Sequence, residues 1–240
     1  MVSGIGPADT LERLDIPIVS ELNGVGQNMQ DHFLFGASYQ VNMLTHAAVS
    51  NPTFLNAARD EYNANGTGIL SNAGGELIAW ERLECDGPGI CNNLSPDVRD
   101  LLGSIPADFP TFEFLMLDAY SGDNQDYSKG GPDPSAMYAS PVASVMIPQS
   151  RGFVTITSND TAVLPVISPN WLNTRADEEL VLHGFRRMRQ MMDTEIMKGA
   201  WVKEVLPGRH IESDEDILNA IKATGIQLFH ASATCRSCQR

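Results

Sequence analysis

Apolar residues alternate with polar or small ones in several short stretches of the chain, which is the pattern of a half-buried β-strand. The clearest stretch is 33–41, where Phe33, Phe35, Ala37 and Tyr39 share one side. Further strands are predicted at 16–19, 76–82, 111–117, 137–147, 153–157 and 164–167. Since most of these runs follow one another without an intervening helix, we expect an antiparallel sheet.

Apolar residues three or four positions apart predict a smaller set of helices. These are expected at 7–14, at 53–63, at 95–102 with Ser95 as N-cap, from Thr174 onward, and from Ser213 to Gly225. In the longest helix, Asp177 is the expected capping-box partner of Thr174. Its apolar stripe would comprise Leu180, Val181, Phe185, Met188, Met192 and Ile196. The predicted fold class is therefore α+β, an antiparallel sheet backed by helices.

Two glycine-rich turns and one histidine segment stand outside this pattern. The chain opens with Ser3-Gly4-Ile5-Gly6-Pro7, then runs from Gly24-Val25-Gly26 through Asn28 to Asp31-His32, and carries Phe229-His230-Ala231-Ser232 near its other end. In this order and at this spacing, the three segments resemble signatures of the glucose-methanol-choline (GMC) family of flavin oxidoreductases. The segments 150–156 and 165–172 are similar to a strand pair of that family's substrate domain. The sequence resembles fungal dehydrogenase-like or aryl-alcohol-oxidase-like members of the family most.

The resemblance implies a division of the chain into three parts. Residues 1–32 would be a remnant of the FAD-binding domain, 33–224 the substrate-binding domain, and 225–240 a truncated segment with the catalytic histidine. The resemblance covers nearly all of the chain but less than half of the family's usual length. We therefore expect the chain to begin inside a domain and to lack the family's second catalytic residue.

The resemblance also assigns roles to single residues. His230 would be the general base that takes the hydroxyl proton of an alcohol while a hydride moves to FAD, a task that suits histidine because its pKa lies near neutral pH. Asn28, Asp31 and His32 would lie near the flavin. From the residues alone, Asp31 could instead cap backbone amides in a turn, and His32 could cover the edge of the sheet.

The cofactor-binding turn of the family is missing from the sequence. A Gly-x-Gly-x-x-Gly turn between a strand and a helix donates amides to the pyrophosphate, whereas Gly4-Ile5-Gly6 and Gly24-Val25-Gly26 lack a third glycine. We therefore expect an FAD-dependent oxidoreductase by family whose polypeptide is inactive alone. The alternative is a truncated, non-catalytic relative that keeps the substrate-domain fold and can oligomerise through an exposed apolar face. A third interpretation is a non-redox cyclisation.

Charge narrows the range of partners. Lys and Arg number 16 against 30 Asp and Glu, giving a formal charge of -14, which repels phosphate backbones and anionic lipid surfaces. No apolar run approaches the roughly 18 to 20 residues that cross a bilayer. The expected partner is a small-molecule alcohol, with no nucleic acid or membrane, and the localisation, secreted or cytoplasmic, is left open.

The cysteines and the remaining histidines do not clearly indicate a disulfide, metal or catalytic site. Cys85 and Cys91 bracket a turn sequence and could form a surface disulfide or remain free thiols. Cys235 and Cys238 form a CxxC pair without the further ligands that a zinc site needs, so no metal is expected. His46, His183 and His210 have no motif around them and are interpreted as packed or solvated residues.

Overall fold

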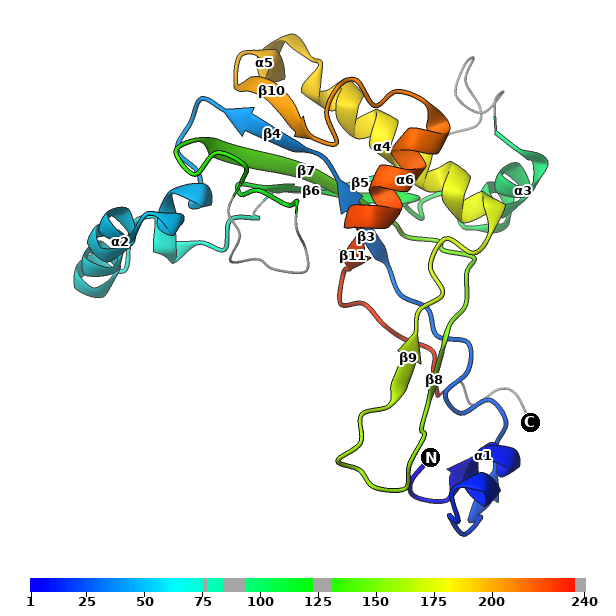
Figure 1. Cartoon of the computed structure of the whole chain (residues 1–240). Helices are drawn as coiled ribbons and strands as arrows, with labels where there is room; N and C mark the ends of the chain where they lie inside the picture. Colours follow the sequence, from blue (N-terminus) through cyan, green and yellow to red (C-terminus); the bar gives the residue numbers. More distant parts are fainter. Residues whose placement is uncertain (76, 84–93, 123–130, 236–240) are drawn as a thin grey trace. The chain divides into compact units, whose positions relative to one another are not determined.

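The computed structural model describes residues 1–75, 77–83, 94–122 and 131–235. These residues form two compact units, each assembled from separate stretches of chain. The smaller unit contains Met1–His32, Ile147–Glu178 and the chain from Gln227 onward, and the larger contains Phe33–Met146 and Glu179–Ile226. Figure 1 shows the elements of both units. The three-part domain division made from the sequence stays a prediction.

The larger unit is built on a seven-stranded sheet with the order β10-β4-β7-β3-β11, to which β6 adds by pairing with β7, and β5 by pairing with β6. The strands are β3 (Phe33–Gly36), β4 (Ser38–Val41), β5 (Leu77–Glu81), β6 (Phe112–Leu117), β7 (Met137–Val145), β10 (Trp201–Leu206) and β11 (Ile226–Gln227). The pairings β10–β4, β3–β7, β4–β7, β5–β6 and β6–β7 are all antiparallel. The expected antiparallel sheet is confirmed.

The single strand predicted at 33–41 is divided into two. Strand β7 pairs with β4 through its first residues, where Tyr39 faces Ala139, and with β3 through its last, where Phe35 faces Ala143. The division falls at Gly36, where a Cβ atom would lie 2.5 Å from the carbonyl oxygen of Pro141. Only glycine allows the backbones to approach this closely, so the strand bends here.

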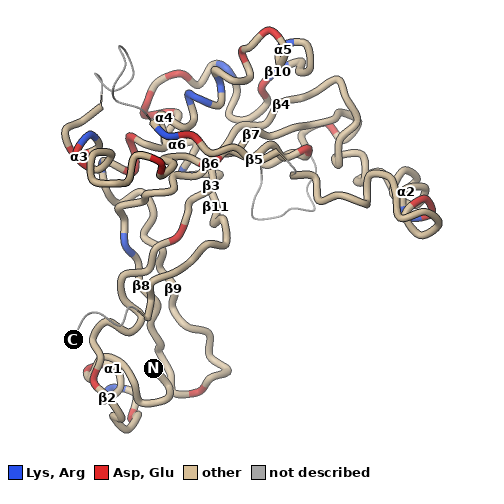
Figure 2. The backbone as a smooth tube through the Cα atoms, turned by 180° about the vertical axis from the view of Figure 1, so that it is seen from behind, with Lys and Arg blue, Asp and Glu red and all other residues tan. Residues whose placement is uncertain are grey.

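Helix α4 (Arg175–Met192) packs against the sheet of the larger unit (Figure 1). Five of its six predicted stripe residues are buried, but Ile196 is 87% exposed because α4 ends at Met192 and Ile196 lies in the short α5 (Glu195–Lys198). Gly184 sits at the contact, where a Cβ would lie 3.0 Å from the Phe35 ring and 3.2 Å from the Phe112 ring. Arginines are closely spaced along the second half of α4, and two of them pair with strands of the sheet, Arg187 with Glu81 of β5 and Arg189 with Glu204 of β10; Lys and Arg positions are blue in Figure 2.

The cap residues explain where the helices begin. The other helices are α1 (Ala8–Arg13), α2 (Pro52–Asn65), α3 (Pro96–Ser104) and α6 (Asp214–Thr224), with 3₁₀ turns at His46–Ser50 and Ile69–Ser71. The Ser95 hydroxyl accepts from Val98 N at 3.4 Å, and that of Ser213 accepts from Asp216 N at 3.1 Å, as predicted from sequence.

The capping box predicted for α4 is only half formed. The Thr174 hydroxyl accepts from Asp177 N at 3.2 Å, but the Asp177 carboxylate accepts from the backbone N–H groups of Gln149 and Ser150, both at 2.7 Å. It also accepts from the Ser150 hydroxyl. A buried carboxylate with several donors is strongly held, so Asp177 joins the first turn of the helix to the loop that precedes β8.

One strand prediction was wrong, and one strand of the structure was not predicted. No strand forms at 16–19, because Ile16 N donates to Leu11 O of α1 and Pro17 has no N–H to donate. The strand in this region is β2 (Ser20–Glu21), which is parallel to β1 (Ile5–Gly6). Strand β10 was not predicted at all. Its buried Glu204 breaks the apolar alternation that marks a strand.

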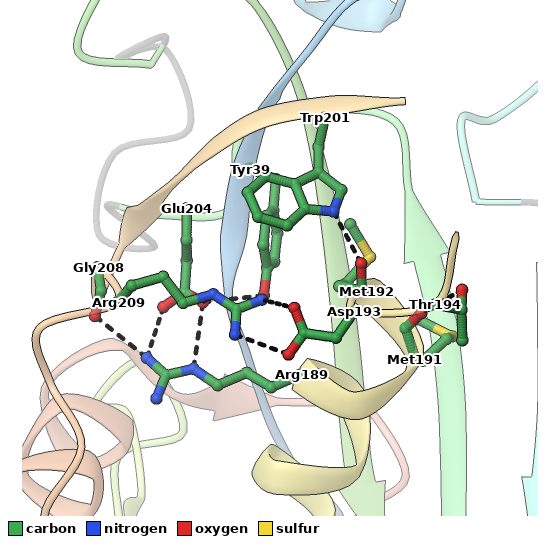
Figure 3. A network of polar contacts seen from close by, with 10 residues as sticks. All are labelled: Tyr39, Arg189, Met191, Met192, Asp193, Thr194, Trp201, Glu204, Gly208 and Arg209. Atoms are coloured by element: carbon green, nitrogen blue, oxygen red, sulfur yellow. Dashed lines mark hydrogen bonds and ion pairs between the residues drawn. The ribbon is translucent and has the colours of Figure 1, made fainter. Parts of the chain in front are cut away.

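The buried charge of Glu204 is compensated by the polar network drawn in Figure 3. Its carboxylate accepts from Arg189 Nε at 3.1 Å and Nη2 at 2.6 Å, and from the Tyr39 hydroxyl at 2.9 Å. Arg209 Nε lies 3.0 Å from Oε2 as a charge contact without hydrogen-bond geometry, and the same guanidinium pairs with Asp193. Burial, followed by the charge of Glu204, raises the pKa of Tyr39 well above its ordinary value.

The smaller unit combines α1 and the β1–β2 pair with an antiparallel hairpin, β8 (Phe153–Thr155) and β9 (Val166–Ser168). Gly26 connects these parts. It has φ +84°, its carbonyl accepts from Val154 N at 2.7 Å, and a Cβ there would lie 2.1 Å from Val154 O. Among the described residues, no helix has both the length and the apolar character required to span a membrane.

Candidate active site

The two segments that carry the motif histidines lie side by side in the smaller unit, although His32 and His230 are 198 positions apart. Gln30 N donates to Ser232 O at 3.0 Å, and Ser232 N donates back to Gln30 O at 2.8 Å. Two positions further on, Leu228 N donates to His32 O at 3.0 Å. These backbone bonds hold the segments antiparallel, one blue before β3 and the other red after β11 in Figure 1.

The backbone bulges outward at His230. Between the paired residues, three residues of one segment, 229–231, face Asp31 alone on the other. Phe229 takes up the extra length with φ +60° and is 77% exposed. A bulge of this kind redirects a side chain out of the ladder, and the His230 ring is accordingly exposed.

Asp31 supports the bulge from inside. The residue is only 5% exposed, and its Oδ1 accepts from His230 N at 3.1 Å. The carboxylate therefore replaces the carbonyl that a regular ladder would offer to this N–H. This is the amide-capping arrangement that the sequence left open for Asp31, and it places Asp31 behind the histidine rather than beside an open surface.

The rings of His32 and His230 are in direct contact. Their Nδ1 atoms lie 3.0 Å apart, and the ring planes are nearly perpendicular at 77° with centroids separated by 5.1 Å. At this distance one Nδ1 must carry a hydrogen and the other must accept it. The contact occupies Nδ1 of His230 and leaves Nε2 as the ring nitrogen outside it.

The Asn28 side chain carries a buried donor. It adopts φ +63°, a conformation that asparagine tolerates better than most residues. Its side-chain Nδ2 is buried, and among the described residues it has no hydrogen-bond partner. Leaving such a donor unpaired costs about 1–3 kcal/mol.

The glycines of the two turns do not form a phosphate cradle. Gly4 has φ +81°, and a Cβ there would lie 2.3 Å from Pro17 O, just as Gly26 is pressed against Val154 O. Both glycines are thus required by contacts within the smaller unit. Gly4 N donates to Met1 O at 2.9 Å and Gly26 N donates to Thr234 O at 2.6 Å, so both N–H groups already have backbone acceptors.

The other histidines and the cysteines lie outside this site. His46 bonds Asp118 Oδ2 at 2.6 Å and Ile69 O at 2.9 Å, and His210 is exposed. Burial lowers the pKa of His183 on α4. Cys235 is a free, exposed thiol, whereas Cys85, Cys91 and Cys238 lie outside the described residues. Within the described ranges, no three His, Cys, Asp or Glu residues gather as metal ligands do.

Comparison with known proteins gives the family. Residues 148–237, which include β8, β9 and His230, match the family model described as GMC oxidoreductase. The chain belongs to the GMC oxidoreductases. The resemblance inferred from the sequence motifs is therefore confirmed, and with it the cofactor, because the family is FAD-dependent.

Relatives of this GMC chain are fungal enzymes. A patulin synthase of Penicillium expansum is 40% identical over 236 residues, which are 98% of this chain and 37% of that protein. A versicolorin B synthase of Aspergillus parasiticus is 38% identical over 242 residues, 98% of this chain and 35% of that protein. The chain therefore spans little more than a third of the length of these relatives.

A solved structure confirms the fold class. The formate oxidase of Aspergillus oryzae RIB40, described in a study of FAD modification, superimposes with a TM-score of 0.81 at 22% identity, over 96% of this chain and 41% of that one. The α+β architecture with an antiparallel sheet is thus that of a GMC oxidoreductase. The sequence motifs named Asn28, Asp31, His32 and His230, but nothing in them signalled that His32 touches His230.

Proposed function

We propose that the protein acts as an FAD-dependent oxidoreductase on the CH–OH group of a small-molecule alcohol, with His230 as the residue that takes the hydroxyl proton. One observation carries the proposal. The His230 ring is exposed on a backbone bulge. The backbone N–H of His230 is held by Asp31, and its ring Nδ1 is occupied by His32. A base prepared in this way has one free nitrogen and a fixed position.

Oxidation of an alcohol removes a proton from oxygen and a hydride from carbon. FAD, when bound, supplies the acceptor for the hydride. Nε2 of His230 takes the proton and the ring becomes an imidazolium, so atoms and charge balance. A positioned base of this kind contributes about 10²- to 10⁴-fold to the rate.

Three further residues support this chemistry. The buried amide of Asn28 would donate to an acceptor oxygen of FAD. Asp31 acts through the backbone of His230, and His32 acts through its ring. Asn28, Asp31 and His32 are the flavin-neighbourhood residues named from the sequence, and we propose that only Asn28 contacts the cofactor directly.

An aromatic or polyketide-like alcohol is the substrate class that we favour. Phe229, which directly precedes His230, presents a ring that is 77% exposed. A planar substrate can stack on such a ring, and aromatic pairs gain about 0.5–1.5 kcal/mol beyond the burial of area.

The 240 residues contain no Gly-x-Gly-x-x-Gly turn. We therefore expect the chain supplied alone to hold FAD weakly and to show no turnover. Activity is best tested in a chimera in which the chain replaces the aligned 236 residues of the Penicillium expansum relative. The chimera should carry FAD and reduce it anaerobically when aromatic primary alcohols are added.

His230→Ala in the chimera should slow flavin reduction by about 10²- to 10⁴-fold, without loss of bound flavin. His210→Ala, at an exposed histidine of the larger unit, is the matched control and should leave the rate unchanged. The rate is followed by the loss of flavin absorbance in stopped flow. Flavin reduction in His230→Ala at the rate of the parent would contradict the proposal.

A non-catalytic chain that associates through an apolar face is the second candidate. Strand β5 favours it, because Ile78 and Trp80, two positions apart and so on one face of the strand, are 50% and 59% exposed, and exposed apolar side chains that lie together often mark an interaction surface. Size-exclusion chromatography separates the two functions. A chain that elutes as a dimer, and a chimera that binds FAD but never reduces it, would favour association over catalysis.

A further inference from the structure

We propose that His32 is a positioning residue that fixes the tautomer of His230. In this proposal His230 donates its Nδ1–H to Nδ1 of His32, so that Nε2 of His230 is left without a proton and can act as the base. The inference deepens the proposed function and rests on it for the use of Nε2. The hydrogen bond itself follows from the geometry.

The distance between the two Nδ1 atoms, 3.0 Å, admits few protonation states. If both atoms carried hydrogen, the two N–H groups would clash, and if neither did, two lone pairs would face each other. A stable contact needs one donor and one acceptor. When both rings are neutral they must therefore be opposite tautomers, one with hydrogen on Nδ1 and the other with hydrogen on Nε2.

Hydrogen bonds hold the main chain at both histidines. Leu228 N is bonded to His32 O at 3.0 Å, and His230 N is bonded to Asp31 Oδ1 at 3.1 Å. The main chain of each histidine is therefore held by a hydrogen bond at that residue. A partner that fixes a histidine tautomer through its second ring nitrogen is a recurring device in enzyme sites.

The direction of the bond follows from the work that His230 has to do. If His32 were the donor, Nε2 of His230 would already carry a hydrogen and could not take one from an alcohol. With His230 as donor, proton uptake at Nε2 turns the contact into a hydrogen bond from an imidazolium. Charge-assisted hydrogen bonds are roughly twice as strong as neutral ones, so His32 stabilises the state that forms during the reaction.

Nuclear magnetic resonance of the full chain tests the tautomers without FAD or substrate. The chain is labelled with [¹⁵N]histidine, treated with EDTA and held near pH 8, where histidine is ordinarily neutral. Ring C–H to nitrogen correlations then report which nitrogen of each of the five histidines carries hydrogen. We expect Nδ1 of His230 to be protonated and Nδ1 of His32 to be bare.

Two variants separate positioning from simple structural support. In His32→Ala, the His230 ring should revert to the Nε2–H tautomer that is usual for free histidine, while backbone signals around Ser232 stay in place. In His32→Gln, a side-chain amide oxygen can still accept from Nδ1–H and should restore the Nδ1–H tautomer in part. In the chimera, His32→Ala should reduce the flavin about tenfold more slowly, a smaller effect than the 10²- to 10⁴-fold loss expected when the base itself is removed, and His32→Gln should recover part of that rate.

The spectra overturn the proposal in two ways. A bare Nδ1 on both rings would mean that no hydrogen bond joins them, and an Nε2–H on His230 with Nδ1–H on His32 would reverse the direction. Either result overturns the positioning role of His32, whereas the need for His230 is decided separately by the rate of flavin reduction in His230→Ala. Conversely, an active His230→Ala chimera would remove the proposed function without changing the tautomers, so the two failures are distinguishable.

Discussion

At the scale of single residues, the feature that decides the position of His230 is the Asp31 carboxylate. A regular ladder would offer a backbone carbonyl to every N–H along the segment, but the bulge at 229–231 leaves His230 N without one. Asp31 is buried and accepts this N–H at 3.1 Å. A hydrogen bond to a charged group contributes about 1.5–3 kcal/mol, which is enough to keep the bulge in one conformation.

Replacing Asp31 should therefore loosen the bulge locally. Asp31→Ala removes the acceptor, and a loss of about 1.5–3 kcal/mol corresponds to roughly 10- to 100-fold faster amide hydrogen exchange at His230. Asp31→Asn keeps an acceptor oxygen and should show a smaller increase. Asp9→Asn, at an exposed residue of the same unit, is the control. Unchanged exchange at His230 in Asp31→Ala would show that the carboxylate does not hold the bulge.

At the scale of elements, the larger unit relies on a charged strand in its sheet. Glu204 of β10 has no exposed side-chain surface, and the side chain of Arg189 from α4 is only 12% exposed. Breaking such a buried pair is costly because the remaining charge is left without a partner. The network in Figure 3 thus ties β10 and α4 together where an apolar contact would ordinarily serve.

Glu204→Gln should destabilise the larger unit by about 3–5 kcal/mol, the range for removing one partner of a buried ion pair. Glu81→Gln is the matched control, because its partner Arg187 and Glu81 itself have side chains 50% and 38% exposed, and exposed pairs contribute about 1 kcal/mol or less. Urea unfolding followed by tryptophan fluorescence measures both. Equal losses in the two variants would show that the buried network contributes no more than a surface pair.

The same elements show how far sequence reasoning reaches. Period-2 and helical spacing predicted β5, β6, β7, α2, α3, α4 and α6, because burial on one face decides these patterns. The pattern failed at β10, whose Glu204 is buried only because arginines from elsewhere meet it, and at Gly36, where a tertiary contact bends the strand. Likewise, local motifs named His32 and His230, but their contact depends on chain pairing across 198 positions.

At the scale of the whole molecule, the unit with the candidate site is assembled from both ends of the described chain and a hairpin from its middle. Asn28, Asp31, His32 and His230 all belong to this smaller unit. A ligand that binds the folded unit stabilises it by RT ln(1 + [L]/Kd). Even a weak FAD site should therefore protect all three stretches together.

Hydrogen exchange measured with FAD at ten times its Kd should show about 1.4 kcal/mol of added protection. Protection should appear in 1–32, 147–178 and 227–235, because these stretches fold as one unit, and Asn28→Ala should weaken it by removing the unpaired amide. Asn72→Ala, in the larger unit, is the control and should leave the protection unchanged. If FAD protected only 33–146, the flavin would bind away from the His32–His230 pair. The proposed contact between Asn28 and FAD would then be wrong.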